Sequence, residues 1–258
     1  MKFRVLSLFP DILKGFFEAS IMKRAVAAGL VEYSLVDIRD YATDKHRKCD
    51  DEVFGGGAGM LMKPEPLDRA LSDAGSPSVR TVYVTPSGRL FNQAMARDLA
   101  AEPELVVLCG RYEGIDQRII DTRVTDEISI GDYVLSSGEV AAMVIIDAVY
   151  RLIPGVISGE SLSEESFSSG ILEYPQYTRP ALYGSMRVPD VLVSGNHAQI
   201  AKWRLKASLA KTLAYRPELL TAQGIQEDAA ELIREAIREW NDGGGWHEPG
   251  TVHTGRAD

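Results

Sequence analysis

Three short stretches combine glycine with polar and aromatic residues directly after apolar runs. Residues 86–89 (PSGR) follow "TVYVT", residues 110–114 (GRYEG) follow "LVVLC", and residues 129–139 (SIGDYVLSSGE) follow "VTDEI". The third stretch has aromatic and aliphatic side chains between its glycines but no cation, which suits an adenine or a thioether better than a pyrophosphate. Each loop alone could be an ordinary turn between two elements. Together they predict a pocket, provided that the strands before them are neighbours.

Four carboxylates and one arginine are candidates for proton transfer. The carboxylates are Glu113, Asp132, Glu164 and Glu165. A carboxylate in a serine-rich stretch is usually only solvated, so the spacing alone leaves the general base open. Arg151 follows an apolar helical pattern, where a cation also stabilises the C-terminal end of the helix dipole.

A further glycine-rich segment spans residues 50–66 (DDEVFGGGAGMLMKPEP). Its backbone N–H groups can cradle a phosphate, and the same glycines can equally form a flexible lid or turn. The segment lacks the Gly-Lys-Ser/Thr ending of a P-loop, which disfavours hydrolysis of a nucleoside triphosphate. The charged run before it (DKHRK) is typical of a solvated surface.

The elements that position these loops alternate between strand and helix over the first 150 residues or so. The apolar patterns predict strands at residues 3–9, 31–38, 79–85, 104–109 and 124–130, and helices at residues 10–29, 63–75, 92–101, 113–122 and 139–153. Such alternation predicts a mostly parallel sheet with helices on both faces, and ligands at the carboxyl ends of its strands.

The remainder of the chain has a different character. Residues 154–190 are rich in Ser, Gly and Pro without a sustained period, so they are expected to form a long connector. Helical patterns follow at residues 196–220 and 225–240. We therefore expect an α/β domain at 1–157, a flexible linker at 158–172, a helical domain at 173–245 and a disordered tail at 246–258.

Charge is distributed unevenly along the chain. The net charge is −9, with 37 Asp and Glu residues, yet the window Val191–Pro217 contains no acidic residue. Its cations are Lys202, Arg204, Lys206, Lys211 and Arg216. This asymmetry predicts a local basic surface suited to nucleic acid on an otherwise acidic protein.

Several classes of protein are excluded by composition. Two cysteines and four scattered histidines give neither a disulfide framework nor zinc-ligand spacing, so no structural metal is expected. Asp147 interrupts the longest apolar run well short of the roughly 20 residues of a membrane span. The N-terminus lacks a signal-peptide core, so we expect a cytoplasmic protein with no membrane partner.

Seven motifs in order resemble one known family. They are "LFPDILKGF", "DDEVFGGGAGMLMKP", "LCGRYEGIDQRI", "EISIGDYVLSSGE", "RLIPGV", "EESFSSGILEYPQYTRP" and "VLVSGNHAQIAKWR". In sequence and spacing they resemble the TrmD family of bacterial tRNA (guanine-N1)-methyltransferases, over about residues 3–220. The resemblance implies an α/β fold of the SPOUT class: a parallel sheet with a C-terminal trefoil knot, plus a small all-helical C-terminal domain. It also implies a homodimer with the active site at the subunit interface.

The resemblance further implies a methyl donor and the residues that bind it. The donor is S-adenosylmethionine, held in a bent form by the three loops. The residues carried over to the donor site are Tyr83, Val84, Thr85, Pro86, Gly110, Tyr112, Glu113, Ile130, Gly131, Asp132, Tyr133, Val134, Leu135 and Gly138. Ala141 stands where the family often has Pro.

The implied acceptor is N1 of the guanosine at position 37 of tRNA, with the anticodon stem-loop as partner. Arg151 matches the catalytic arginine, and Glu165 matches a catalytic aspartate, with Glu164 as the alternative base. RNA contacts are expected from Gly56, Gly57, Lys202 and Arg204. The sequence leaves open the tRNA isoacceptors and whether Mg²⁺ acts in proton removal or only supports the RNA.

Three other functions are considered. A nicotinamide-dependent oxidoreductase requires Gly-x-Gly-x-x-Gly after the first strand, and "SLFPDIL" has no glycine there. A non-catalytic RNA-binding module would use the basic helix but leave the three loops without a role. A different SPOUT methyltransferase is the nearest alternative, although "GRYEGID" and "YTRP" fit the guanosine-37 enzymes better.

Overall fold

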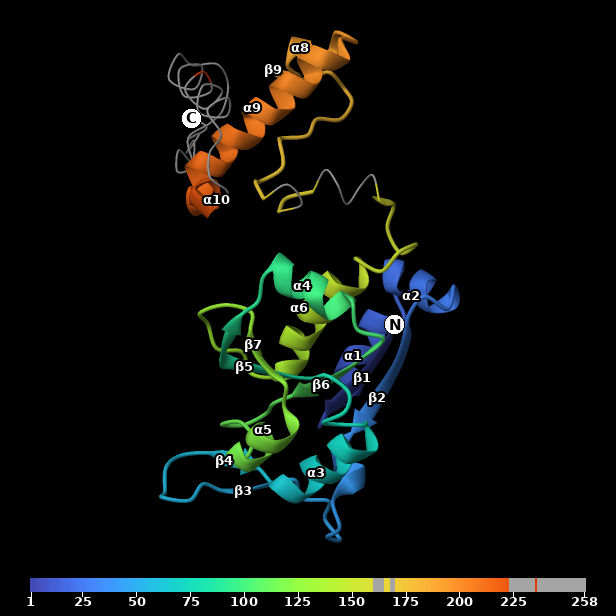
Figure 1. Ribbon diagram of the computed structural model, residues 1–258, viewed down its shortest axis with the longest axis vertical. Helices are drawn as coiled ribbons and strands as arrows, with labels where there is room; N and C mark the ends of the chain where they lie inside the picture. Colours follow the sequence, from blue (N-terminus) through green and yellow to red (C-terminus); the bar gives the residue numbers. More distant parts are fainter. Residues whose placement is uncertain (160–164, 168–169, 223–234, 236–258) are drawn as a thin grey trace, which may run out of the picture. The chain divides into compact units, whose positions relative to one another are not determined.

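A five-stranded parallel sheet forms the centre of the first of two units (Figure 1). The computed structural model describes residues 1–159, 165–167, 170–222 and 235, and it divides the chain into units Met1–Gly159 and Glu160–Asp258. The strand order is β2-β1-β6-β5-β7. The strands are β1 (Lys2–Ser7), β2 (Glu32–Asp37), β5 (Thr81–Leu90), β6 (Glu104–Cys109) and β7 (Asp126–Ser129). The parallel α/β sheet expected from the sequence is confirmed.

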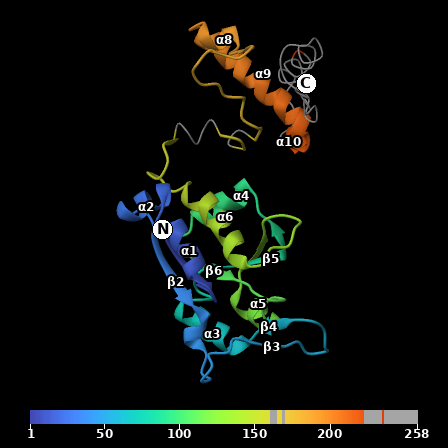
Figure 2. The same ribbon diagram turned by 180° about the vertical axis from the view of Figure 1, so that it is seen from behind.

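Helices cover both faces of this sheet, as Figures 1 and 2 show from opposite sides. One face carries α1 (Asp11–Phe17), α2 (Ser20–Ala27), α4 (Gln93–Ala100) and α6 (Gly138–Tyr150); the other carries the 3-10 helix η1 (Ile38–Tyr41), α3 (Pro64–Asp73) and α5 (Gln117–Arg123). Successive side chains of a strand point to opposite faces. In β6, Leu105 and Val107 accordingly join the first core, while Val106 and Leu108 join the second.

The helix expected at residues 10–29 is two helices. Leu13 and Phe17 are buried in α1, but the next buried side chain is Met22, one residue later than a continuous helix would place it. Ala19 is extended, which ends α1 and shifts the buried face of α2 onto the same core. The expected stop at Gly29 is confirmed, because this residue has a φ of +69°.

Strand β5 extends further than the apolar pattern predicts. It was expected to end at Thr85, yet it resumes pairing with β7 after an excursion at residues 85–88. Val84 and Arg89 both lie opposite Ile128, so the excursion is a bulge within the strand. A Cβ on Gly88 would overlap the backbone of Glu127, which explains the glycine.

The glycine-rich segment forms a β-hairpin that the sequence did not predict. Strand β3 (Asp50–Glu52) pairs antiparallel with β4 (Met60–Met62), and the glycines lie in the loop between them. The hairpin is bonded to the loop after β6, because Glu113 N donates to Met60 O at 3.1 Å and Met62 N donates to Gly114 O at 3.0 Å.

The second unit contains short strands and helices. Strand β8 (Leu182–Tyr183) pairs antiparallel with β9 (Met186–Arg187), and α8 (Asp190–Val193), α9 (His197–Tyr215) and α10 (Glu218–Ala222) follow. The β8–β9 pair departs from an all-helical domain and interrupts the expected connector. The predicted helix at 196–220 ends at Tyr215, because Pro217 removes a backbone donor.

Some expectations fall outside these observations. The helix at 225–240, apart from Glu235, and the tail at 246–258 lie outside the described residues. The trefoil knot and the three boundaries between the predicted segments stay predictions. A search of the described helices for one long and apolar enough to cross a membrane found none.

Two neighbouring residues of α1 test how much the core stabilises the fold. Leu13 is fully buried, whereas Ile12 is 45% exposed. Leu13→Ala should lower the free energy of unfolding by about 2–5 kcal/mol, because it leaves a cavity. Ile12→Ala should change it by about 1 kcal/mol or less. Urea unfolding of both variants measures the difference; equal losses would contradict the placement of α1.

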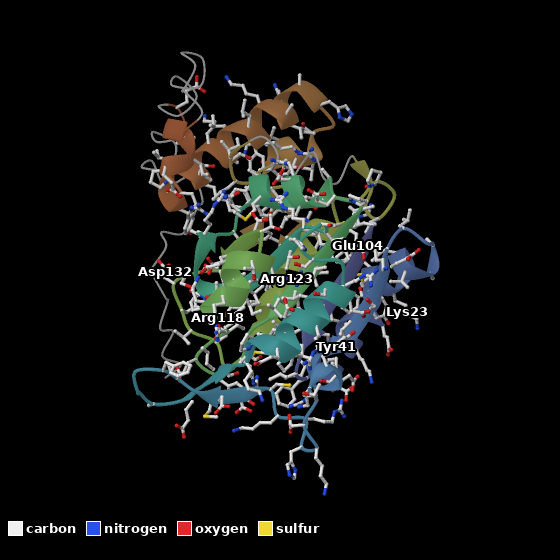
Figure 3. All side chains as sticks on the ribbon, turned by 60° about the horizontal axis from the view of Figure 1, so that its bottom comes forward. Lys23, Tyr41, Glu104, Arg118, Arg123 and Asp132 are labelled. Carbon is white, nitrogen blue, oxygen red and sulfur yellow. The ribbon has the colours of Figure 1, made fainter. Side chains whose placement is uncertain are left out.

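A hydrogen bond between η1 and α3 predicts an unusual titration. Tyr41, labelled in Figure 3, donates its phenol proton to Asp73 Oδ2 at 2.7 Å. This hydrogen bond, followed by burial and the charge of Asp73, raises the pKa of Tyr41 to about 12. The bond therefore stabilises the fold below pH of about 10, and this contribution is lost as the pH rises through the folded pKa.

Ultraviolet titration of phenolate absorbance measures this pKa. Subtracting the curve of Tyr41→Phe isolates the Tyr41 signal from the other tyrosines. Asp73→Ala should return the pKa of Tyr41 toward about 10. A Tyr41 pKa near 10 in the unchanged protein would contradict the hydrogen bond.

Candidate functional site

The three glycine-bearing loops meet in one cavity of the first unit, with a volume of about 300 Å³. Its walls come from the bulge in β5, the loop after β6 and the loop after β7. The expected neighbourhood of these strands is confirmed by the order β6-β5-β7. All the residues expected at the donor site line this cavity except Asp132. Asp132 is exposed and lies at the edge of the first unit in Figure 3.

Two glycines allow close packing around the cavity, one against backbone and one against an aromatic ring. Gly138 N donates to Gly110 O at 3.0 Å, and a Cβ on Gly138 would lie 2.7 Å from Gly110 N. A Cβ on Gly110 would lie 2.9 Å from the ring of Tyr83. The ring of Tyr83 is buried, and burial raises the pKa of its phenol. Tyr83 therefore stays protonated and forms a wall behind Gly110.

The loop after β7 is shaped by its own tyrosine. Gly131 has a φ of +150°, and a Cβ there would overlap the ring of Tyr133. Tyr133 Oη donates to Ile130 O at 3.0 Å, which folds the side chain back onto the loop. Val134 is 85% exposed at the rim. The loop thus offers apolar surface and backbone polar groups to a ligand, as its composition suggested.

The loop after β6 contributes side chains to the opposite wall. Tyr112 has a φ of +58° and is half-exposed. A Cβ on Gly59 of the hairpin would overlap the carboxylate of Glu113, so that glycine makes room for the acid. The hairpin therefore packs against this wall of the cavity and stabilises it.

A buried carboxylate lies beneath the cavity, and the sequence reasoning did not single it out. Glu139 is 1% exposed, and its Oε1 accepts a hydrogen bond from Ser7 Oγ at 2.5 Å. Arg111 Nη1 lies 4.0 Å from its other oxygen. Burial and then the charge of Glu139 raise the pKa of Cys109 well above its usual value, so this thiol stays protonated.

Other lining residues were also missed. They are Ser87, Gly114, Ile128, Ser129, Ser136, Ser137 and Ala141. Arg111, which lies within the expected stretch 110–113, also lines the cavity. All except Ala141, which lies in α6, belong to or directly adjoin one of the three loops, so loop membership was the available signal. The inward or outward direction of each side chain was not readable from the sequence.

The two expected catalytic residues belong to different units. Arg151 follows the last turn of α6, where its N–H donates to Asp147 O at 3.5 Å. It is not among the residues that line the cavity. Glu165 is half-buried in the second unit, and Glu164 lies outside the described residues. The catalytic pair therefore stays a prediction.

The expected RNA-binding residues are similarly divided. Gly56 and Gly57 are exposed at the tip of the β3–β4 hairpin. On α9, Lys202 Nζ lies 3.6 Å from Glu235, and the guanidinium of Arg204 lies 4.6 Å from the ring centre of Tyr174. Acidic residues beyond the acid-free window thus partly offset its charge, which the sequence alone did not indicate.

A search of the described residues for clusters of three or more Asp, Glu, His or Cys that could hold a metal ion found none. A role for Mg²⁺ therefore gains no support from this part of the chain.

The sheet and its loops define a class of protein: a parallel α/β protein with a ligand pocket at the carboxyl ends of three neighbouring strands. Comparison with known families and proteins is more specific. The family model described as tRNA (Guanine-1)-methyltransferase TrmD matches residues 1–222. The chain therefore belongs to this family.

Similar proteins named tRNA (guanine-N(1)-)-methyltransferase occur in several bacteria. The protein of Treponema denticola is 62% identical over 220 residues, which cover 85% of this chain and 90% of that protein. The Treponema pallidum protein is 54% identical, covering 91% and 96% of the two chains. The Geotalea uraniireducens protein is 52% identical, covering 92% and 98%.

Two glycine-to-alanine substitutions show whether donor binding depends on the backbone contact at the pocket. Gly138→Ala should abolish or strongly weaken ligand binding, because the new methyl group would push apart Gly138 and the backbone of residues 109–110. Gly15→Ala in α1 is the control: a Cβ there meets nothing within 4 Å, so the variant should be as stable as the parent or slightly more so. Calorimetric titration with S-adenosylmethionine measures binding, and equal affinity in both variants would contradict this account.

Proposed function

We propose that the chain transfers a methyl group from S-adenosylmethionine to N1 of the guanosine at position 37 of tRNA. Membership of the TrmD family supports the reaction class. The observation that carries the proposal is the single cavity where all three expected donor loops meet. In this proposal the protein acts in the cytoplasm on the anticodon stem-loop.

The cavity suits the adenosyl part of the donor. Its lining includes the apolar side chains of Val84, Ile130 and Leu135, beside backbone groups of two glycines in close contact. Apolar walls with a few fixed polar groups are typical of sites that bind a planar base. When bound, S-adenosylmethionine supplies a methyl group on a positively charged sulfur.

Two side chains would carry the acid–base chemistry. N1 of guanine holds a proton, so a carboxylate must accept that proton for N1 to become a nucleophile. We assign this role to Glu165, with Glu164 as the alternative. Arg151 would stabilise the negative charge that develops on the guanine oxygen. Glutamate instead of the family's aspartate extends the carboxylate by one methylene group.

In this proposal the chain forms a trefoil knot, and two copies of it form a homodimer. The backbone contact between Gly138 and Gly110 supports the knot, because it brings the start of α6 against the end of β6. Val140 and Val144 on α6 are 44% and 45% exposed, an apolar surface that a second subunit could cover. In this arrangement the active site lies at the subunit interface, and the C-terminal helices bind tRNA.

The nearest alternative function is that of another SPOUT methyltransferase. Such an enzyme would bind the same donor in the same pocket but methylate a different RNA position. A non-catalytic RNA-binding module would show no methyl transfer at all. A transfer assay with labelled donor and two tRNAs, one with guanosine and one with adenosine at position 37, separates these functions. We expect label only in the guanosine form, at N1.

Substitutions at the two assigned residues test the chemistry. Glu165→Ala should lower kcat by about 10²–10⁴-fold, and Arg151→Ala by about 10²–10³-fold. Glu165→Asp should retain substantial activity, because it restores the family's carboxylate. Arg24→Ala is the control, since Arg24 also lies in the last turn of a helix in the first unit. Near-parental turnover in either alanine variant would remove that residue from the mechanism.

A further inference from the structure

The buried carboxylate of Glu139 requires a compensating charge. Glu139 lies in the first turn of α6 and is 1% exposed. Its Oε1 accepts a hydrogen bond from Ser7 Oγ at the end of β1. Its Oε2 is buried, and the described residues provide it with no hydrogen-bond donor. Burying a charged carboxylate oxygen without a hydrogen-bond donor costs free energy. A nearby cation is therefore needed to stabilise Glu139 in this position.

Arg111 is the cation nearest to this oxygen. Its Nη1 lies 4.0 Å from Glu139 Oε2 and donates a hydrogen bond to Ser136 O at 3.2 Å. Arg111 belongs to the loop after β6 and Ser136 to the loop after β7, and both line the cavity. One guanidinium therefore links two walls of the pocket from a position beside the buried acid.

The neighbouring groups leave Arg111 as the partner of Glu139. The guanidiniums of Arg39 and Arg111 lie 4.4 and 4.6 Å from the ring centre of Phe9. Arg39, however, donates to Leu8 O and lies 3.9 Å from Asp37. Its charge is thus directed to another carboxylate. The thiol of Cys109, whose pKa is raised by burial and by the charge of Glu139, stays neutral.

We propose that Glu139 is a positioning residue for the donor pocket. Its buried charge fixes Arg111, and Arg111 in turn holds the loops at residues 110–114 and 130–137 at the separation that the donor requires. The inference rests on the proposed donor pocket. It assigns a role to a residue that does not line the cavity.

Glu139→Gln tests this role with little change in shape. The amide can still accept the hydrogen bond of Ser7, but it has no charge to attract Arg111. We expect the Kd for S-adenosylmethionine and its KM to rise by about tenfold, because the partly buried ion pair with Arg111 is lost. The kcat at saturating donor should stay close to that of the parent, because the variant changes the walls and not the acid–base residues.

Glu104→Gln is the matched control. Glu104 lies at the opposite end of β6 and pairs with Arg4 and Lys2, away from the cavity. Losing that pair should leave donor affinity unchanged. Equal loss of affinity in both variants would point to a general effect on the sheet and overturn the positioning role.

A double-mutant cycle shows whether Glu139 acts through Arg111. Arg111→Gln alone should weaken donor binding to a similar extent. The variant with both substitutions should bind about as weakly as the weaker single variant, because the second change removes nothing further. Additive losses would mean that the two residues act independently and would overturn the inference.

The outcomes also separate this inference from the proposed function. If the parent protein binds no donor, the proposed function fails and the inference fails with it. If the parent binds the donor and Glu139→Gln binds equally well, only the positioning role is wrong. If Glu139→Gln does not fold, hydrogen exchange of Arg111→Gln decides: faster exchange of amides 131–138 supports the role, and unchanged exchange overturns it.

Discussion

The close contact between Gly138 and Gly110 is the constraint on which the pocket depends. The hydrogen bond between them joins the start of α6 to the end of β6. Because Gly138 has no side chain, its backbone approaches Gly110 to a separation that a Cβ on Gly138 would prevent. The cavity is therefore formed by the packing of main chain against main chain. This makes its shape depend on the sheet order more than on the rotamers of flexible side chains.

Charge is placed in two different ways in this protein. Around Arg80, a guanidinium at the surface pairs with Asp126 of the neighbouring strand and with Asp98 of α4, which ties edges of the fold together. Beneath the cavity, in contrast, a carboxylate is almost fully buried, and the part of the chain that the structure describes gives it one direct donor, Ser7. In the first arrangement, the charge of Arg80 is balanced by the two aspartates beside it. The second is left dependent on a residue of the pocket wall, which is why we connect it with function.

The sequence predicted the parallel sheet and the three pocket loops, because both depend on local patterns. Apolar runs of strand length and glycines at their ends are visible without any knowledge of contacts. The break before Ser20 was missed because it reflects a one-residue shift of the buried face. Glu139 was missed because a charged residue in a helical first turn is usually solvated, and only the tertiary fold reveals its burial. The Arg151–Glu165 pair came from family resemblance alone.

The position of β1 between β2 and β6 has a consequence for the order of assembly. Lys2 lies opposite Glu104 in the sheet, although about a hundred residues of chain separate them. During synthesis β1 can pair with β2 early, but its other edge stays open until β6 has emerged. The cavity requires still more of the chain, since α6 closes it. Long-range contacts of this kind slow folding, and the ligand site cannot be complete before α6 has been synthesised.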